Sequence, residues 1–408
     1  MTYVFVADDF TGASDTLATL ARAGFRARLF RDLPDPSEIN GLDAWGIATN
    51  ARSLGSADIT ALAARIGRGL AGYAPDFVHV KVCSTFDSSA GTGNIAAFAL
   101  GLSASLGIGK VAVIGGQPSL GRYAVFGTLF AQGPDGAVHR IDRHPVMSCH
   151  PVTPMDEADL IRHFTRIGLA GLARIDRGAR LRAPFPRFYD IFDQDDVIAA
   201  GGALLAEEGP VLVIGPSSVA EAWIANRPPA AISGRNDLRG DGPVFAFAGS
   251  RSPGTTAQIA AARDMTRLPV APADILPGVP ARDLALGWVR ERLSRGQDCL
   301  VYLTADVAGV SPACIADASA EFVRDSLRDV AVAGLIVAGG DTSSAVVGHL
   351  APDCLDYAAD ICPGVPILIG RLAEDYLPLA LKGGQMGGDD FFDRAVRCLK
   401  GQESSPPA

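Results

Sequence analysis

The chain has 408 residues, of which 48% are hydrophobic and 20% charged, and its formal net charge is −9. This composition is typical of a globular protein with room for two domains, and it excludes collagen-like, disordered and small disulfide-rich proteins. The acidic balance, without any lysine or arginine run, argues against a nucleic-acid partner.

The first fifteen residues predict a strand, a tight turn and a helix. Tyr3 to Ala7 is an apolar run rich in β-branched and aromatic residues, and helical spacing begins at Thr16. Open α/β sheets bind ligands at the carboxyl ends of their strands, so the turn can hold a polar substrate together with a base. One of the two aspartates can serve as a helix cap, and the other is then available as a catalytic base. The polar and small residues of this stretch are Asp8, Asp9, Thr11, Gly12 and, expected in the first helical turn, Asp15.

The next two predicted strands are 27–30 and 44–48, and the second runs into a polar segment that contains Arg52. The planar guanidinium of Arg52 matches the geometry of a carboxylate, so it is a candidate for binding an acidic substrate. An exposed surface arginine is the alternative interpretation.

A second polar segment follows a predicted helix at 59–70 and a predicted strand at 76–80. Its lysine, hydroxyls and carboxylate suit a polyol or a phosphate oxygen. Cys83 lies among them, but without a paired His and Asn or Asp pattern a cysteine nucleophile is disfavoured. The candidate substrate-binding residues here are Lys81, Ser84, Thr85, Asp87 and Ser88.

Further strand-to-loop transitions complete the first half of the chain. The predicted strand at 111–114 enters a glycine-rich loop with Gln117 and Arg122, and the segment 123–140 is predicted to be a hairpin that turns at 134–136. Strands are also predicted at 188–192 and 211–214. This alternation of strands and helices predicts a doubly wound, largely parallel sheet.

Residues 226–243 are rich in Pro, Gly, Ala and Arg and show no periodicity, which predicts a linker between two domains. Beyond it, strands are expected at 244–248, 300–303, 335–338 and 379–382, with a helix from Ala257. Loops of small residues and hydroxyls follow three of these strands and are suited to phosphate. Their candidate residues are Ser250, Ser252, Gly339, Gly340, Asp341, Thr342, Gly383 and Gly384.

The location expected for this chain is the cytoplasm. It begins with a folded strand rather than a basic and apolar leader, and no apolar run reaches about 18 residues. Its seven cysteines include no CxxC pair, which predicts free thiols in a reducing compartment rather than a zinc site. The expected partners are small molecules, with neither nucleic acid nor a membrane, and a homodimer is the base-rate expectation.

Taken together, the motifs resemble those of the four-carbon acid sugar kinases. They are ADDFTGASD, KVCSTFDSS, AGSRSP, GGDTSSAV and LKGGQMGGDDFF, in the order seen in that family. The resemblance implies an acid-sugar-binding domain at 1–230 and an ATP-binding domain at 242–402, each built on a largely parallel sheet, with the active site in the cleft between them. KVCSTFDSS resembles the 3-oxo-tetronate kinase branch, whereas threonate kinases more often have KxDSTxRGN. Three motifs depart from the commoner family forms GGETSG, KSGNFG and GSCS.

Phosphoryl transfer needs a carboxylate near the acceptor hydroxyl and positive charge, including Mg²⁺, on the phosphates of ATP. Asp9 is favoured over Asp8 as the base, with Asp87 next, and Arg52 or Lys81 is expected to pair with the substrate carboxylate. A non-catalytic sugar-acid binding protein remains an alternative. An NAD(P)-dependent dehydrogenase is less favoured because no GxGxxG follows the first strand.

Overall fold

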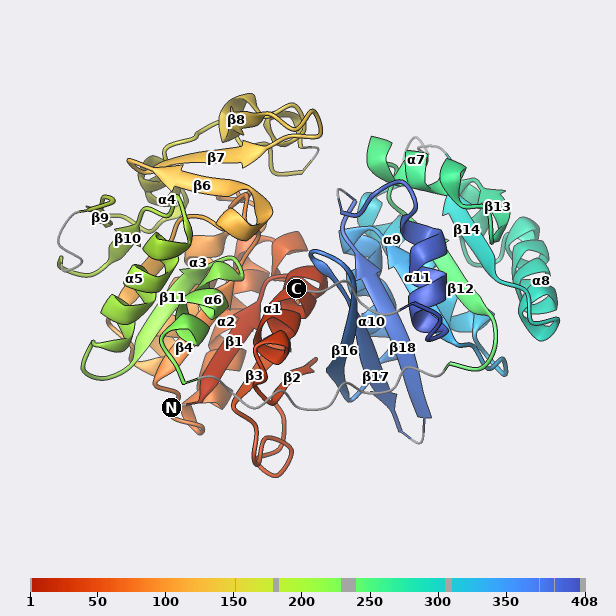
Figure 1. Ribbon diagram of the computed structural model, residues 1–408, viewed down its shortest axis with the longest axis horizontal. Coiled ribbons are helices and arrows are strands. Elements are labelled where there is room, and N and C mark those ends of the chain that lie inside the picture. The colour runs from red at the N-terminus through yellow and green to blue at the C-terminus, as the bar shows by residue number, and fades with distance from the viewer. Residues whose placement is uncertain are drawn as a thin grey trace. The chain divides into compact units, whose positions relative to one another are not determined.

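A computed structural model describes residues 2–150, 152–178, 183–228, 240–304, 310–373, 375–384 and 386–403. The chain divides into two units, Met1–Ser233 and Gly234–Ala408 (Figure 1). Most of the linker predicted at 226–243 lies outside the described residues. The strands of each unit form a largely parallel layer flanked by helices, which confirms the predicted fold class. Within the described ranges, no helix is long and apolar enough to cross a membrane.

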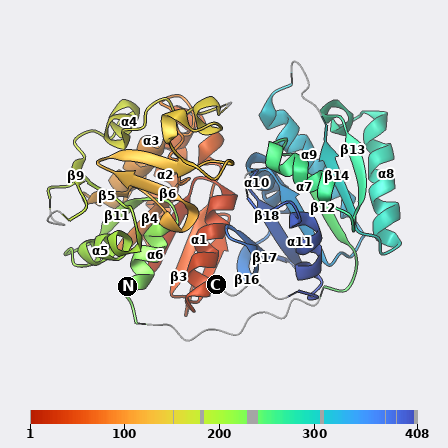
Figure 2. The same ribbon diagram turned by 45° about the horizontal axis from the view of Figure 1, so that its top comes forward.

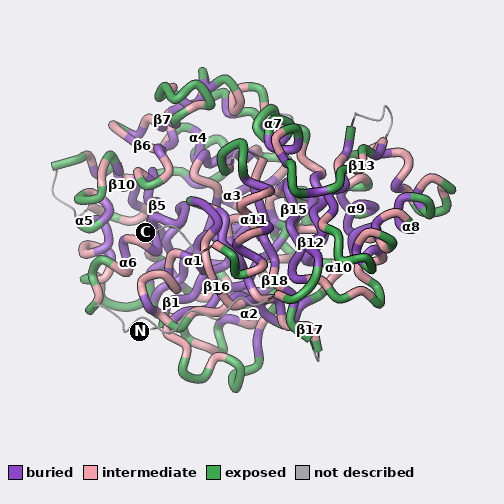
Figure 3. The backbone as a smooth tube through the Cα atoms, turned by 45° about the vertical axis from the view of Figure 1, so that its right-hand side comes forward, coloured by how far each residue is buried: buried purple, intermediate pink, exposed green. Residues whose placement is uncertain are grey.

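The strands of the first unit run parallel in the order β2-β3-β1-β4-β11-β5-β10-β9. Four of the strands predicted in this unit have the predicted bounds, namely 3–7, 27–30, 44–48 and 111–114. All but 27–30 are uninterrupted apolar runs that the layer buries completely. Figure 3 shows β1 and β5 in the buried colour. The strands are β1 (Tyr3–Ala7), β2 (Ala27–Phe30), β3 (Ala44–Ala48), β4 (Phe77–Lys81), β5 (Val111–Ile114), β9 (Ala173–Ile175), β10 (Arg187–Tyr189) and β11 (Val211–Gly215).

The helices of the first unit cover both faces of the layer. The chain leaves β1 through α1 toward one edge, whereas it leaves β3 and β4 through α2 and α3 toward the other edge. Because such crossovers are right-handed, α1 lies on the opposite face from α2 and α3. In agreement, α2 packs on α3, and α1 packs on α6. The helices are α1 (Phe10–Arg22), α2 (Ser56–Ala71), α3 (Ile95–Leu106), α4 (Leu160–Ile167), α5 (Gln194–Leu205) and α6 (Ser218–Ala225), with 3₁₀ turns η1 (Ala51–Ser53), η2 (Pro118–Leu120), η3 (Ile141–Arg143) and η4 (Met147–Cys149).

The segment predicted to be a hairpin is a separate three-stranded sheet, which Figure 2 shows in front of the main layer of this unit. Its strands are β6 (Arg122–Val125), β7 (Thr128–Gln132) and β8 (Val138–Arg140). The prediction was wrong in treating 123–131 as one strand. Phe126 and Gly127 have φ angles of 52° and 77°, so the chain reverses there in a tight turn.

The strands of the second unit have the order β13-β14-β12-β15-β18-β17-β16. The neighbours from β13 to β18 are parallel, whereas β17 is antiparallel to both β18 and β16. Sequence analysis missed β13, β16 and β17. In β16, register shifts at Tyr357/Ala359 and Asp360/Cys362 interrupt the alternation that marks a strand. The strands are β12 (Val244–Ala248), β13 (Thr266–Val270), β14 (Cys299–Leu303), β15 (Gly334–Ala338), β16 (Cys354–Cys362), β17 (Val365–Leu372) and β18 (Asp375–Lys382).

The helices of this unit also divide between two faces: α9 packs on α8 and α10, and α7 packs on α11. The helix expected from Ala257 begins earlier, at Pro253, because Ser252 caps it and Pro253 suits the first helical position. The buried core lies between β12, β15 and α11. The helices are α7 (Pro253–Ala261), α8 (Pro280–Ser294), α9 (Pro312–Ser326), α10 (Gly340–Leu350) and α11 (Phe391–Leu399), with the 3₁₀ turn η5 (Pro272–Ile275).

Candidate functional site

Three loops of the first unit meet at the carboxyl ends of the neighbouring strands β3, β1 and β4. The backbone joins them: Asp8 N–H donates to Lys81 O at 3.0 Å, and Arg52 N–H donates to Asp8 O at 3.1 Å. The loop after β1 leads to one face of the layer, and the loops after β3 and β4 lead to the other face. Such a topological switch point is the usual ligand site of an open α/β sheet.

Asp9 is the cap of helix α1. Its Oδ1 accepts a hydrogen bond from Gly12 N–H at 2.5 Å, and its Oδ2 accepts one from Arg52 Nη1 at 2.8 Å. The helix therefore begins at Phe10, so the expectation that Asp15 lies in its first turn was wrong. Both carboxylate oxygens of Asp9, the favoured base, already have protein partners.

Asp8 has a different environment. Only 5% of the residue is exposed, its Oδ2 lies 3.4 Å from Arg52 Nη2, and its Oδ1 has no hydrogen-bond partner among the described residues. Burial raises the pKa of Asp8 to about 7; nearby Asp9 and Asp87 add to the rise, while Arg52 and Lys81 oppose it. This carboxyl group can therefore exchange a proton near neutral pH.

Arg52 lies in η1, and its guanidinium pairs with carboxylates of the protein itself. Its guanidinium is 2.8 Å from Asp9, 3.4 Å from Asp8 and 4.0 Å from Asp87. Nε and Nη2 of Arg52 are buried and make no hydrogen bond to a described residue. The position makes Arg52 the centre of a carboxylate cluster, which differs from the expected role of binding the substrate's carboxylate.

The loop after β4 holds Asp87 in a set of hydrogen bonds. Thr85 Oγ1 donates to Asp87 Oδ1 at 2.6 Å, and Thr153 Oγ1 donates to Oδ2 at 3.0 Å. Burial acts to raise the pKa of Asp87, but Arg52 and these hydrogen bonds outweigh it, so the pKa is lowered. Ser88 Oγ lies 3.0 Å from His163 Nε2 in the interior. Asp87 is thus a stable anion, and Ser88 contacts the core.

Ser84 and Thr11 are half-buried, and their hydroxyls make no hydrogen bond to any residue that the structure describes. The glycine-rich loop after β5 contains Gln117, which is buried and pairs with Arg122 through the backbone. Arg122 Nη1 donates to Leu120 O, while its Nε is buried and has no partner among the residues that the structure describes.

Arg122 forms no ion pair with a carboxylate in the described part of the chain. Burial lowers the pKa of Arg122, against smaller opposing effects of Cys83 and Tyr123. A largely buried guanidinium without a counter-ion among the described residues is a candidate site for an anion.

Gly12 lets Lys81 approach the start of α1. An added Cβ at Gly12 would lie 2.7 Å from Asp9 Oδ1 and 2.8 Å from Lys81 Nζ. Both atoms are held in place, because Asp9 Oδ1 caps the helix and Lys81 Nζ donates to Val82 O at 2.8 Å. Lys81 therefore brings a buried positive charge to the helix N-terminus.

We expect Gly12→Ala to lower the melting temperature of the first unit in calorimetry. Alanine is the better helix former by about 0.8–1 kcal/mol, but displacing fixed groups in a packed site costs about 1–3 kcal/mol. The control is Gly287→Ala in α8, where an added Cβ meets nothing within 4 Å, so the substitution should raise the melting temperature of the second unit. A rise with Gly12→Ala as well would contradict the packing described here.

In the second unit, three loops meet at the carboxyl ends of the parallel strands β12, β15 and β18. Gly249 N–H and Ser250 N–H donate to Ala338 O at 2.9 and 3.0 Å, and Gly339 N–H donates to Lys382 O at 2.8 Å. The chain leaves β12 and β15 toward opposite edges, through α7 and α10, so this is a second switch point.

Hydroxyls and glycines line this second site. Ser252 Oγ donates to Gly384 O at 2.6 Å, and Ser250 Oγ lies 3.3 Å from Ser252 Oγ. A Cβ at Gly384 would lie 2.8 Å from Ser250 Oγ, and Gly339 has a φ of 127°, which L side chains rarely adopt. Both positions therefore require glycine, and the backbone there can approach a ligand closely.

Helix α10 begins in this site without a side-chain cap, so its first N–H groups can receive an anion. Gly340 is its first residue, Asp341 lies exposed in its first turn, and Thr342 is buried next to Gly249. Gly383 follows Lys382 at the end of β18. The structure thus brings together the predicted residues of all three loops of this unit.

Sequence analysis missed Lys382 as a site residue, because it was taken only as the last residue of a strand. The side chain is completely buried, and Nζ donates to Thr255 Oγ1 at 3.2 Å and to Gly383 O at 3.1 Å. The signal available was a lysine at the end of an apolar run, directly before two glycines.

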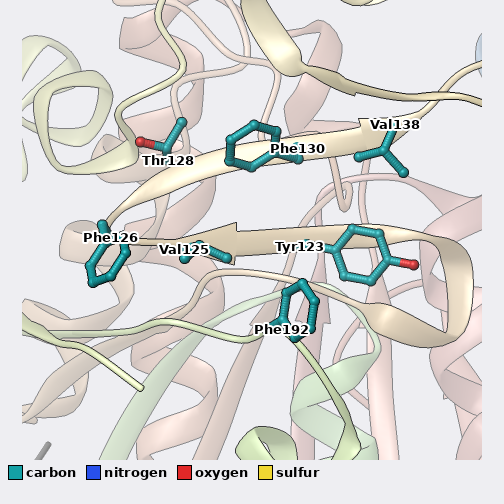
Figure 4. Close-up of a pocket in the computed structure, with 7 residues that line it drawn as sticks. All are labelled: Tyr123, Val125, Phe126, Thr128, Phe130, Val138 and Phe192. Atoms are coloured by element: carbon teal, nitrogen blue, oxygen red, sulfur yellow. The ribbon is translucent and has the colours of Figure 1, made fainter. Parts of the chain in front are cut away.

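An apolar pocket of about 440 Å³ lies over β6 and β7, apart from these polar loops (Figure 4). None of its lining residues is charged, so the pocket offers no positive charge for an acidic ligand. Its lining residues are Tyr123, Val125, Phe126, Thr128, Phe130, Val138 and Phe192. In the ranges given above, no group of three or more His, Cys, Asp or Glu residues could hold a metal ion.

Comparisons with known proteins match both halves of the chain. Residues 3–223 match a family model described as a sugar-binding N-terminal domain, and residues 245–392 match one described as a nucleotide-binding C-terminal domain. The chain is 34% identical to a 3-oxo-tetronate kinase of Burkholderia multivorans, over 97% of both chains. It is 32% identical to a 3-oxo-isoapionate kinase of Paraburkholderia graminis, over 95% of this chain and 92% of the relative.

Solved structures share the fold. A crystal structure from Salmonella typhimurium, named provisionally as a tRNA synthase, superposes with a TM-score of 0.77 at 23% identity over 98% of this chain and 99% of that one. A Haemophilus influenzae protein gives a TM-score of 0.68 at 24% identity, over 96% and 98% of the two chains. At such identities the likeness establishes the fold alone.

Proposed function

This chain belongs to the four-carbon acid sugar kinase family, and from that premise we propose that it transfers a phosphoryl group from ATP to a hydroxyl of a four-carbon acid sugar. The acceptor is a 3-oxo-tetronate or a related acid, as in the relatives named above. The observation that carries the proposal is the carboxyl of Asp8, which lies at a ligand-binding switch point with one unpartnered oxygen and a pKa raised to about 7 by burial.

In the proposed mechanism, residues 1–230 bind the acid sugar. Asp8 Oδ1 accepts the proton of the attacking hydroxyl, since a base is most effective when its pKa lies near the working pH. This assignment replaces Asp9, the base favoured from sequence, because the oxygens of Asp9 are occupied by the helix cap and by Arg52. Arg52, whose Nη2 lies 3.4 Å from Asp8 and 4.0 Å from Asp87, holds Asp8 in place.

The substrate's carboxylate pairs with Arg122 in this proposal, because Arg122 has no counter-ion in the described ranges, whereas Arg52 is surrounded by aspartates. Lys81 and the N-terminus of α1 attract the negative charge of the acid and of the group being transferred. The remaining proposed contacts are hydrogen bonds to sugar hydroxyls from Thr11, Ser84, Thr85 and Gln117.

Residues 242–402 bind the nucleotide in this proposal. The residues fit the group: glycine is required at two positions, and α10 presents free N–H groups to a phosphate. ATP supplies the phosphoryl group, and Mg²⁺ bound with it neutralises charge. Since no group of three or more His, Cys, Asp or Glu residues in the described ranges could hold a metal ion, we propose that phosphates and water hold the Mg²⁺, as is usual for this ion. The proposed ATP contacts are Ser250, Ser252, Gly339, Gly340, Asp341, Thr342, Gly383 and Gly384.

The direct test measures ADP release when ATP and Mg²⁺ are supplied with a panel of acids. We expect ADP release with at least one of the 3-oxo-tetronates, 3-oxo-isoapionate, threonate and erythronate. When NAD(P) replaces ATP, we expect no reaction with any of these acids. The control is the same panel without ATP, analysed for unchanged acid. Tight binding of an acid with no ADP release from any member would instead support a non-catalytic binding protein.

A further inference from the structure

Lys382, at the end of β18, is an isolated positive charge inside the second unit. Its side chain is 0% exposed, and its ammonium group donates to Thr255 Oγ1 at 3.2 Å and to Gly383 O at 3.1 Å. An ammonium group has three donors, so one remains after these two hydrogen bonds. Both acceptors are neutral, and no carboxylate of the described residues lies within ion-pair distance of Lys382.

The groups packed around Lys382 do not neutralise it. Among the described residues, Cys362 on β16 is the titratable group that acts on the pKa of Lys382, and the ring of Phe391 on α11 lies 5.5 Å from Nζ. Burial raises the pKa of the Cys362 thiol to about 11, so this group is uncharged at neutral pH. Asp360 acts on Cys362 from the same strand, and Arg394 and Asp390 act on it from α11 and the start of that helix.

A buried charge without a partner is costly, and proteins normally pair or neutralise it. Burial accordingly lowers the pKa of Lys382 to about 8, with a small opposing effect of Cys362. The charge is nevertheless retained at neutral pH beneath two loops that share a network: Thr255 Oγ1 and Ser252 Oγ both lie within hydrogen-bond distance of Gly384 O.

We propose that Lys382 is the built-in counter-charge for a phosphate group of the bound nucleotide, which it attracts from beneath Thr255 and Gly384. The inference rests on the proposed nucleotide-binding function of this unit and adds a residue to it. Lys382 attracts the phosphate through space without touching it and supports the loop that contacts it, so it is a positioning residue. The bound phosphate in turn supplies the missing negative charge and raises the pKa of Lys382.

Proton uptake on ADP binding tests this role. Calorimetric titration at pH 8 in two buffers of different ionisation enthalpy should show uptake of up to about half a proton per ADP, because about half of Lys382 is then neutral in the free protein. Near pH 6.5 the proton uptake by Lys382 should vanish. Only the proton exchange of ADP itself should remain, and it should be the same in the parent protein and in the variants of Lys382. A merely structural lysine would not produce this signal.

Two variants separate charge from packing. Lys382→Met should weaken ADP binding by about ten- to a hundredfold, the range of a charge-assisted interaction, and should abolish the uptake. Lys382→Arg keeps the charge but does not titrate near pH 8, so a folded variant should bind ADP and take up no proton. The control, Lys400→Met, removes a lysine that is paired with Asp298 at 2.7 Å, and should leave both ADP affinity and uptake unchanged.

The outcomes distinguish the inference from the function on which it rests. If the parent protein binds neither ADP nor ATP, the proposed nucleotide function fails. If the parent binds ADP without proton uptake at pH 8, or if folded Lys382→Met binds it equally well, the nucleotide function stands and the role of Lys382 is overturned. Should Lys382→Met not fold, the comparison of the parent with Lys382→Arg decides alone.

Discussion

Asp8→Asn is expected to lower kcat by about 10²- to 10⁴-fold, the usual contribution of a positioned general base. Asparagine keeps the shape of the side chain but cannot accept the proton of the attacking hydroxyl. Because Asp8 lies in the first unit and ATP is assigned to the second, the KM for ATP should change little. Steady-state kinetics with the best acid of the panel measures both values.

The pH dependence provides a second readout of Asp8→Asn. The base must be ionised, so kcat/KM for the acid should rise with pH through about 7 in the parent protein and be flat there in the variant. The pKa of Asp8 is higher in the folded protein than in the unfolded chain. The contribution of Asp8 to the free energy of unfolding is therefore present at low pH and is lost as the pH rises from about 4 to about 7. Asp8→Asn should therefore not destabilise the protein at pH 8.

Asp9→Asn is the matched control. Asparagine is as good a helix cap as aspartate, so the fold should survive, while the ion pair with Arg52 is lost. We expect a smaller fall in kcat than with Asp8→Asn. The opposite result would be a kcat within about threefold of the parent for Asp8→Asn, far short of the loss of a base, and a larger fall for Asp9→Asn. In that case Asp9 is the base, as predicted from the sequence.

Arg122→Gln is expected to raise the KM for the acid sugar by about ten- to a hundredfold with a smaller effect on kcat. A charge-assisted hydrogen bond contributes about 1.5–3 kcal/mol, and no carboxylate in the described part of the chain pairs with Arg122 and competes with the substrate. Arg122→Lys should recover only part of the loss, since lysine lacks the planar fork that binds a carboxylate in two places.

A neutral four-carbon polyol supplies the control for Arg122. Without a carboxylate, the polyol should bind the parent protein and Arg122→Gln with similar, weak affinity. Arg52→Ala should instead lower the stability of the protein, because it removes the positively charged partner of a buried carboxylate cluster. Breaking a buried ion pair in this way costs about 3–5 kcal/mol. Equal effects of Arg122→Gln on the acid and the polyol would argue against a carboxylate contact.

The sequence by itself determined the strands that the layers bury completely, such as 3–7, 44–48 and 244–248. An uninterrupted apolar run between polar turns has few other ways to fold. It also placed polar residues at the strand ends, and the order of the motifs indicated the family. It could not predict β16, whose bulges break the alternation on which strand prediction relies.

Only the tertiary structure decided what each site residue does. Asp8 and Asp9 are adjacent and chemically identical, yet one caps α1 and the other keeps a free oxygen, because Arg52 and Lys81 arrive from β3 and β4 on either side of β1. Lys382 became a site residue only because α7 and β18 meet. Strand order sets such encounters between segments distant in the chain, and local sequence patterns carry little information about that order.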